Sequence, residues 1–414
     1  MQIPKIEYFE DVTLDPFNMD GVLFGEVEDV FSILEQARVE GGGVQARSML
    51  EILGGPMHND VPGMPQYSVI SFSAAEAALK NTRTFSNKII KMSLGETCGD
   101  VIPTLDAPEH TYLRKQIEPL FMPSQIRQWA TDIVDPVISD MIGKFIDKGE
   151  ADLIEQFARL YPFEIIYRQL EMPPEDARLF HRLAVTLTWT GDGLKYGIEA
   201  GQKLDKYFKA LLALRREQPG QDLVSLLAGR PGRDPEILTD KCIIDFLKLL
   251  INAAGDTTYR TTGSMLIGLL TNPDQLEAVR QDRSLVPRAL EEGLRWNGPF
   301  ITSPRVTTED TELEGVKIPK GAFVHIGLAA ANNDPARIEN PRQFNLFRGT
   351  KNHVGFGMGP HMCLGQHLAR LEMTRALNAI LDRLPNLRLD PSKPPPKISG
   401  ATMRTPNGLH VLFG

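Results

Sequence analysis

The residues around Cys363 are where the sequence first indicates chemistry. Cys363 is one of only three cysteines in 414 residues, and residues 356–365 also hold three glycines and a proline. Residues 366–377 carry apolar side chains at three- and four-residue spacing, which predicts a helix. Cys363 would then lie at the N-terminus of that helix, where free backbone N–H groups and the helix dipole lower the pKa of a thiol.

Three interpretations of this cysteine stay open from the residues alone. A free cysteine often serves as a small buried hydrophobic residue in a structural turn. As a nucleophile, Cys363 would need a base, and His361 two residues earlier is a candidate. As a metal ligand, it would need only its thiolate and open space on the far side of the metal. The glycines favour the last two interpretations, because glycine lets a backbone or a flat ligand approach closely.

A second stretch places poor helix-forming residues in the middle of an apolar segment. Residues 240–271 are apolar nearly all round, which predicts one long helix through the core. The middle of this segment carries Gly255, Asp256 and Thr257, which are poor residues for a helix interior. One interpretation is a bent helix with Asp256 facing solvent or a salt bridge. The other is an acid–alcohol pair that opens onto a buried cavity, since a broken local rule in a core often marks a site.

Composition and patterning place both stretches in one mostly helical domain. Hydrophobic residues make up 42 % of the chain and charged residues 24 %, as in ordinary soluble globular proteins. The net charge of −8 does not indicate binding to nucleic acid or to an anionic membrane. We expect a single domain over residues 1–414. Its helical core should lie at about 73–300 and 365–384, and its small β portion at about 1–72, 310–325 and 385–414.

The cysteines and the first residues indicate the compartment. Cys98, Cys242 and Cys363 are far apart and odd in number, without the spacing of a disulfide framework or a CxxC metal site. Residues 1–7 contain no apolar run, so we expect neither a signal peptide nor a membrane anchor. The chain is therefore expected to be cytoplasmic.

The pattern F-G-x-G-x-H-x-C-x-G at residues 356–365 resembles the haem-binding loop of the cytochrome P450 family, in its soluble bacterial type. The resemblance implies a mainly α triangular-prism fold with a small β portion, and a haem b (iron protoporphyrin IX) whose iron is bound by Cys363. It also implies a monooxygenase that inserts one oxygen atom of dioxygen into a small apolar substrate. The electrons would come from a ferredoxin and its NAD(P)H-dependent reductase, which would dock on the thiolate side near Arg114 and Lys115.

Other motifs of the family have counterparts in the chain. Residues 253–257 match its A/G-G-x-D/E-T signature, with Ala254 where glycine is usual. The resemblance assigns Thr257 to hydrogen bonding with dioxygen and Asp256 to relaying protons. It implies propionate contacts from His110, Arg114, Arg305 and His361, and further haem contacts from Phe356 and Ala253. Glu292 and Arg295 match the structural E-x-x-R pair, and Arg342 is the expected third member of that network, although it stands one place early in the family's P-x-R-F pattern.

The family's pocket segments imply where the substrate would lie. They correspond to a loop at residues 89–102 and to Leu187, Trp189, Leu249, Asn252, Ala253, Ile301, Thr302, Thr402 and Met403. Most of these side chains are apolar, as in ligand pockets generally. Asn252 carries a polar amide within the apolar 240–271 segment, and we expect this amide to hydrogen-bond a substrate oxygen. The hypothesis is an apolar substrate with one polar group, such as a terpenoid, a steroid or an aromatic compound.

Three rival functions remain to be weighed against this one. A peroxide-driven or isomerising haem-thiolate enzyme would share the fold, but such members often lack the acid–alcohol pair. A haem-binding sensor or electron carrier would not need a proton relay. A haem-free helical protein with a structural Cys363 would have no use for the four predicted propionate contacts.

Overall fold

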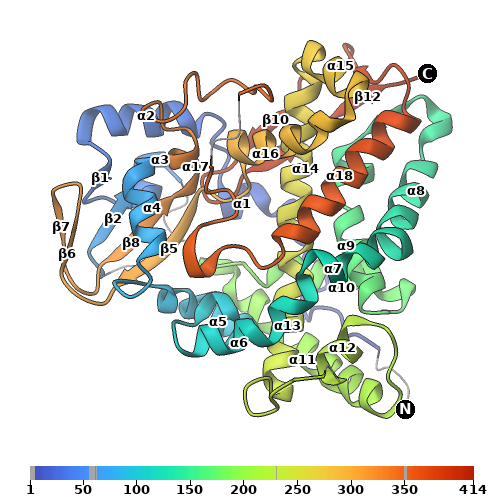
Figure 1. The fold of residues 1–414 in the computed structure, drawn as a ribbon, viewed down its shortest axis with the longest axis horizontal. Coiled ribbons are helices and arrows are strands. Elements are labelled where there is room, and N and C mark those ends of the chain that lie inside the picture. The colour runs from blue at the N-terminus through green and yellow to red at the C-terminus, as the bar shows by residue number, and fades with distance from the viewer. Residues whose placement is uncertain (1–4, 56–60, 62, 230, 349–351) are drawn as a thin grey trace.

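Two consecutive helices cross the middle of the molecule and carry the predicted acid and alcohol (Figure 1). The computed structural model describes residues 5–55, 61, 63–229, 231–348 and 352–414, and in it α13 spans Asp240–Ala253 and α14 spans Gly255–Leu270. The sequence predicted one helix here, and the structure interrupts it at Ala254. The hydroxyl of Thr257 donates to the carbonyl oxygen of Ala253 at 2.9 Å, a bond of the kind that bends helices.

The glycine at the start of α14 brings this helix close to α9 (Tyr161–Gln169). A Cβ at Gly255 would lie 2.5 Å from the ring of Phe163, so a larger residue would force the two helices apart. Buried residues of α13 belong to a hydrophobic cluster with α10 and α11, whereas those of α14 belong to another with α8, α16 and α18. The helix pair therefore joins the two largest parts of the hydrophobic core.

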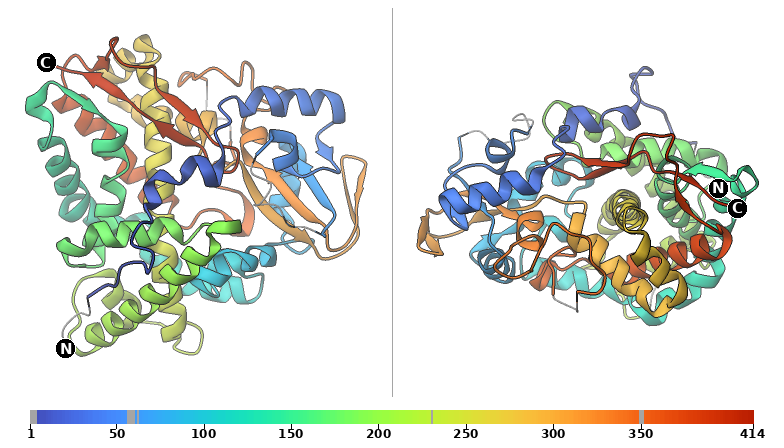
Figure 2. Two further views of the ribbon diagram at one scale, coloured as in Figure 1. Left: turned by 180° about the vertical axis from the view of Figure 1, so that it is seen from behind. Right: turned by 90° about the horizontal axis from the view of Figure 1, so that it is seen from above.

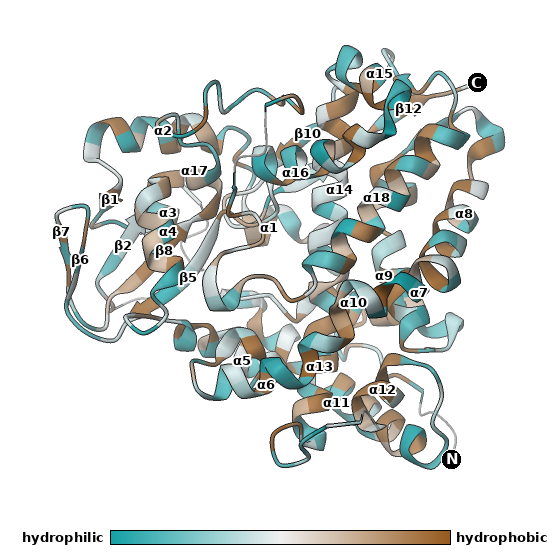
Figure 3. Ribbon diagram, viewed as in Figure 1, coloured by the Kyte–Doolittle hydropathy of each residue, from teal (hydrophilic) through white to brown (hydrophobic). Residues whose placement is uncertain are grey.

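The other helices surround this pair, and the view from above shows α14 end-on among them (Figure 2). Outer helices such as α8 and α18 alternate hydrophobic and hydrophilic residues, as expected for helices that pack by one face (Figure 3). Their bounds are α1 Asp20–Phe24, α2 Val30–Gly41, α3 Met49–Leu53, α4 Phe72–Lys80, α5 Leu94–Cys98, α6 Glu109–Ile117, α7 Pro123–Trp129, α8 Asp135–Gly143, α10 Ala177–Thr186, α11 Leu194–Glu217, α12 Leu223–Gly229, α15 Pro273–Gln281, α16 Val286–Asn297, α17 Leu328–Asn332 and α18 Gln366–Arg383.

A five-stranded sheet lies to one side of the helices, with the strand order β1-β2-β8-β5-β3. Strands β2 and β8 are parallel and the other pairs are antiparallel. Its strands β3 and β5 lie outside the ranges predicted for the β portion. The strands are β1 Val44–Gln45, β2 Gln66–Val69, β3 Phe85–Ser86, β5 Thr302–Thr307 and β8 Phe323–Gly327, and the smaller sheets hold β4 Glu150–Asp152, β6 Thr311–Leu313, β7 Val316–Ile318, β9 Arg388–Leu389, β10 Lys397–Ser399, β11 Thr405–Asn407 and β12 His410–Leu412.

The segment predicted as a loop at residues 89–102 contains short helical turns instead. Turn η3 spans Asn87–Met92, α5 follows, and η4 spans Ile102–Thr104. Each piece is too short to leave a period in the sequence, which is why the pattern looked irregular. The turns are fixed by local bonds such as that from the Lys88 N–H to the Ser86 hydroxyl, at 3.1 Å.

Among the described residues, none of the helices combines the length and the apolar character that a membrane crossing requires. Part of the expectation about the N-terminus rests on residues 1–4, which lie outside the described residues.

Glu292 of α16 pairs with two arginines in a buried network. Both Nε and Nη2 of Arg295 lie 2.8 Å from its carboxylate oxygens. The other arginine is Arg348, whose Nε lies 3.3 Å from Glu292 Oε1. The prediction that Arg342 belongs here is wrong, because its side chain is exposed and pairs with Asp29 at 2.7 Å. Arg342 instead ties the segment before Phe344 to the start of α2.

Replacing Glu292→Ala should strongly destabilise the fold, because two arginines would lose their shared counter-charge. Removing one partner of a buried ion pair costs about 3–5 kcal/mol, and we expect the free energy of unfolding in urea to fall by about that amount. Glu76→Ala is the matched control, because it breaks an exposed pair with Lys80 at 2.8 Å and should change stability by less than about 1 kcal/mol. Similar small losses in both variants would contradict a structural role for the Glu292 network.

Candidate functional site

The loop before α18 holds Cys363 in a fixed backbone geometry. The N–H of Cys363 donates to the carbonyl oxygen of Phe356 at 2.8 Å, which closes the loop. Gly357 and Gly359 have φ angles of 71° and 74°, in the left-handed region that favours glycine. A Cβ at Gly359 would lie 2.7 Å from the carbonyl oxygen of Leu79 in α4. The loop can therefore press against α4 only because this residue is glycine.

The thiol of Cys363 is partly buried and surrounded by groups that favour its anion. Burial raises the pKa of the Cys363 thiol, whereas the N–H groups of Gly365 and Gln366 and the charges of Arg114 and Arg370 lower it. The net direction is upward, so the lowered pKa expected from the helix N-terminus is wrong for the protein without a metal. A metal ion deprotonates a thiol that coordinates it, and these four groups would then stabilise the thiolate.

Arg370 of α18 was not among the predicted site residues. Its guanidinium lies 4.3 Å from the centre of the Phe356 ring, so the predicted haem contact Phe356 is held in place by a cation–π interaction. Arg370 also forms an ion pair with Glu291 at 2.5 Å. Its position seven residues after Cys363, two helical turns along the predicted helix, is the signal that could have identified it.

Arg114 lies beside the same loop on α6. Its Nη1 donates to the carbonyl oxygens of Met362 at 2.8 Å and Pro360 at 3.2 Å, and its Nη2 pairs with Glu118 at 2.9 Å. These bonds hold the two residues on either side of His361. The propionate role of Arg114 stays a prediction, and its observed contacts position the cysteine loop.

Three of the predicted propionate contacts have a buried nitrogen atom without a hydrogen-bond partner. His110 is 3 % exposed and Arg305 is 2 % exposed, and the rings of His110 and His361 lie 4.0 Å apart. The His110 Nε2, His361 Nδ1 and Arg305 Nε atoms are buried without a hydrogen-bond partner in the described part of the chain. Burial lowers the pKa of Arg305 to about 10, with Asp106 opposing the shift. Buried polar nitrogens of this kind need partners. The Arg305 Nε–H donates, and a carboxylate would also accept from either ring nitrogen in the tautomer that carries its proton there.

One face of the α13–α14 pair is open although it lies in the core. Ala253 is exposed and Leu249 and Thr257 are partly exposed, whereas most residues around them are buried. Positions 249, 253 and 257 are four apart and lie on one helix face. Leu249 packs against the same hydrophobic cluster as Leu364, which follows Cys363. This face of the helix pair therefore keeps accessible surface at Leu249, Ala253 and Thr257.

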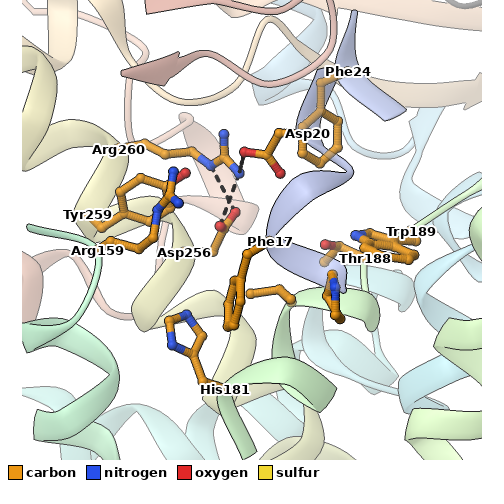
Figure 4. A pocket seen from close by; sticks show the side chains of 12 residues that line it. Phe17, Asp20, Phe24, Arg159, His181, Thr188, Trp189, Asp256, Tyr259 and Arg260 are labelled. Carbon is orange, nitrogen blue, oxygen red and sulfur yellow. Dashed lines mark hydrogen bonds and ion pairs between the residues drawn. The ribbon is translucent and has the colours of Figure 1, made fainter. Parts of the chain in front are cut away.

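Asp256 lies on a neighbouring face of α14 and is buried. Its carboxylate oxygens are 3.1 Å from Nε and Nη2 of Arg260, one turn along the helix (Figure 4). Burial raises the pKa of Asp256, and the charge and hydrogen bonds of Arg260 oppose that shift. Asp256 is thus next to Thr257 in the chain, but its carboxylate is bound to Arg260 and not to the Thr257 hydroxyl.

The predicted substrate contacts divide into two groups. Leu249, Ala253, Thr302 and Thr402 have accessible surface, whereas Leu187, Asn252, Ile301 and Met403 are buried. Trp189 is also buried and lines a small cavity beside Asp256 and Arg260.

The expected hydrogen bond between Asn252 and a substrate is not supported. The Asn252 Nδ2 donates to the carbonyl oxygen of Ala184 in α10 at 2.8 Å, and its side chain is buried. Its amide therefore fastens α13 to α10.

These residues fit a haem. The partly exposed thiol offers a ligand, and the three buried unpartnered donors match the two carboxylates of the porphyrin. The exposed Ala253 leaves room for a flat ring because its side chain is only a methyl group.

Comparison with known proteins places the chain among relatives of one family. The family model described as Cytochrome P450 matches residues 175–413, more than half of the chain. Cytochrome P450-terp of Pseudomonas sp is 30 % identical to this chain over 347 residues, which cover 79 % of this chain and 80 % of the relative. The cytochrome P450 monooxygenase PikC of Streptomyces venezuelae is 34 % identical over 291 residues, 69 % of both chains.

The fold is also similar to that of solved structures. CYP108D1 from Novosphingobium aromaticivorans matches with a TM-score of 0.81 and 27 % identity, covering 97 % of both chains. This match confirms the predicted fold class, mainly α with small sheets.

Gly359→Ala should weaken haem retention, because a Cβ there would collide with the Leu79 carbonyl and displace the cysteine loop. Gly357→Ala is the matched control in the same loop: its φ is also positive, but the nearest atom would be 3.8 Å from the Cβ. Each variant bears the left-handed backbone penalty of about 1–2 kcal/mol, and only Gly359→Ala bears the collision as well. The rate of haem transfer to excess apomyoglobin measures the difference. Equal rates for the two variants would show that the contact with α4 does not hold the loop.

Proposed function

Because the chain belongs to the cytochrome P450 family, whose members are haem-thiolate monooxygenases, we propose that it hydroxylates an apolar small molecule with electrons from a ferredoxin and its NAD(P)H-dependent reductase. The observation that most supports this proposal is the open face of α13–α14, where Ala253 and Thr257 have accessible surface inside the core. A protein that used its haem only for sensing or electron transfer would have no need of an acid and an alcohol there.

The haem supplies dioxygen activation by its iron, and this chain's residues hold the group. Cys363 would be the iron ligand, supported by the N–H groups of Gly365 and Gln366. His110, His361 and Arg305 would bind the propionates, which would satisfy their unpartnered buried nitrogens. The ring of Phe356 would pack beside the haem.

Thr257 and Asp256 would manage protons on the opposite side. The Thr257 hydroxyl gives its hydrogen to the Ala253 carbonyl, so its oxygen lone pairs are free to accept a hydrogen bond from a bound species. Asp256 would deliver the proton, and for this its carboxylate has to turn from Arg260 toward Thr257. Proton transfer by positioned side chains commonly contributes about 10²–10⁴-fold to a rate.

The substrate is proposed to be bound by shape and apolar contact. Leu249 and Ala253 offer hydrocarbon surface, and Thr302 of β5 is partly exposed. Since the Asn252 amide is already used by the fold, selectivity would rest on positioning the reacting carbon in the space near Thr257.

The redox partner is proposed to dock over the cysteine loop. Lys115 is exposed on α6, and Met362 beside Cys363 is 38 % exposed. Positive charge from Lys115 and Arg114 would attract an acidic ferredoxin, although the whole chain has a net charge of −8.

Carbon monoxide tests the iron ligand. Added to the dithionite-reduced protein, it should give the strongly red-shifted Soret band of a thiolate-bound haem. Cys363→Ser should lose that band because the hydroxyl is a far weaker anionic ligand, while Cys242→Ser should keep it. A wild-type band typical of histidine ligation would overturn the assignment of Cys363.

Thr257→Ala should uncouple NAD(P)H oxidation from product formation. A panel of terpenoids, steroids and aromatic compounds is first screened by spin-state shift, and the compound with the largest shift is used. Product per NAD(P)H should fall several-fold, because the proton is no longer directed, and hydrogen peroxide should rise. Thr271→Ala is the matched control, since Thr271 makes the same backbone bond, to the Ile267 carbonyl at 2.7 Å, at the far end of the helix. Unchanged coupling in Thr257→Ala would contradict the role of this hydroxyl.

A further inference from the structure

A small polar cavity lies beside Asp256, beneath the N-terminal segment that runs from turn η1 (Pro16–Asn18) into α1. Its volume is about 20 Å³, and its lining includes the polar side chains of Asp20, Arg159, His181, Asp256 and Arg260 (Figure 4). A cavity needs about 10–15 Å³ measured in this way to hold one water molecule, together with two to four polar partners. This cavity meets both conditions.

Arg260 stands between two carboxylates in this cavity. Its guanidinium contacts Asp256 on its own helix, and its Nη2 lies 3.2 Å from Asp20 Oδ2 on α1. The Arg260 Nη1 donates to the hydroxyl of Thr405, which in turn donates to Asp20 at 3.2 Å. Arg260 is therefore held from the N-terminal side independently of Asp256.

A partition separates the small cavity from a larger groove with a volume of about 400 Å³ between α8, α9 and α10. Phe17, Arg159 and His181 line both spaces. The His181 ring lies 4.7 Å from that of Phe17 and 3.8 Å from that of Phe163.

The ring of His181 lies in this partition. The side chain is 7 % exposed and forms no hydrogen bond within the described residues. Burial lowers the pKa of His181 to about 3, so the ring is neutral and has one donor and one acceptor nitrogen.

We propose that this cavity is the water site from which Asp256 regains its proton, and that Asp20 is the positioning residue that frees Asp256 to move. The inference rests on the proposed monooxygenase function and adds the route by which solvent protons reach its acid. It also gives a function to the N-terminal segment, which supplies both Asp20 and Phe17.

The proton balance is simple. When Asp256 turns to Thr257 and gives up a proton, it is left as a carboxylate. It returns to Arg260 and takes a proton from the cavity water while a proton from the groove reaches the same water through His181, so no free hydroxide forms. His181 accepts this proton on one ring nitrogen and releases the proton on the other, so no net charge stays in the cavity.

Asp20 is needed because the movement of Asp256 would otherwise leave a buried arginine without a counter-charge. Arg260 is 2 % exposed, and an unpaired charge at such a depth is strongly unfavourable. With Asp20 and Thr405 in contact, Arg260 keeps a carboxylate partner while Asp256 is turned away. Without Asp20, Asp256 would be the only carboxylate of the described residues paired with Arg260 and could not leave it.

Asp20→Asn tests this in the haem-loaded enzyme with the panel compound that gives the largest spin-state shift. With dioxygen, NAD(P)H and a surrogate bacterial ferredoxin and reductase, product per NAD(P)H should fall about three- to tenfold, and the solvent deuterium isotope effect should rise. With hydrogen peroxide as the oxidant, product formation should change less than about twofold, because peroxide brings its own two protons. Asp20→Glu should restore much of the dioxygen-driven coupling.

Asp11→Asn is the matched control. Asp11 lies in the same N-terminal segment, but it bonds Thr13 at 2.6 Å and Tyr196 at 3.1 Å instead of the cavity residues. Equal losses with dioxygen and with peroxide in Asp20→Asn would mean that Asp20 only supports the fold, and unchanged coupling would mean that it has no part in proton supply. Either result overturns the proposal.

A readout independent of turnover is a high-resolution crystal structure of the haem-loaded protein. It should contain an ordered water in hydrogen-bond contact with Asp256 and His181, and His181→Phe should lack that water. A dry cavity in the wild type would overturn the proposal. Failure of the proposed function would be seen separately, as absence of the red-shifted carbon monoxide band in the wild type.

Discussion

The α13–α14 helix pair has to bury hydrophobic side chains around most of its circumference and still leave one face open inside the core. Ala253 and Thr257 lie on that face, and Ile251, Tyr259 and Met265 are buried on the others. The tight contact of Gly255 with Phe163 fixes the helix against α9. The buried faces therefore hold the helix pair in place, and the open face is held with them.

The buried donors create a second constraint. An unpartnered buried polar group costs about 1–3 kcal/mol, and His110, His361 and Arg305 each contribute one such nitrogen. These atoms lie on α6, on the cysteine loop and on β5, which come from distant parts of the chain. In the proposed binding mode, a ligand with two carboxylates would relieve the three penalties at once and would join the sheet side of the molecule to the helical side. The free energy of haem binding would then be partly free energy of folding.

Sequence reasoning reaches furthest where the candidate residues are consecutive. The loop at 356–365 and the Gly255–Asp256–Thr257 run can be identified because their spacing is fixed by the chain itself. It failed where a partner comes from far away: Arg348, not Arg342, reaches Glu292, and the Asn252 amide binds a carbonyl of α10. Asp20 is separated from Arg260 by 240 residues, and an isolated acid before a short helix carries no local signal.

Asp256 shows why such distant partners matter. A carboxylate in the core has to be paired to be stable, yet the proposed proton carrier would have to leave its partner. Pairing with Arg260 alone would satisfy the first demand and defeat the second. A guanidinium has five donors, so Arg260 can bind Asp256, Asp20 and Thr405 together and release one of them without being left unpaired. The fold supplies the additional acceptors from its N-terminal segment and its last strands, so both ends of the chain meet at the acid in its middle.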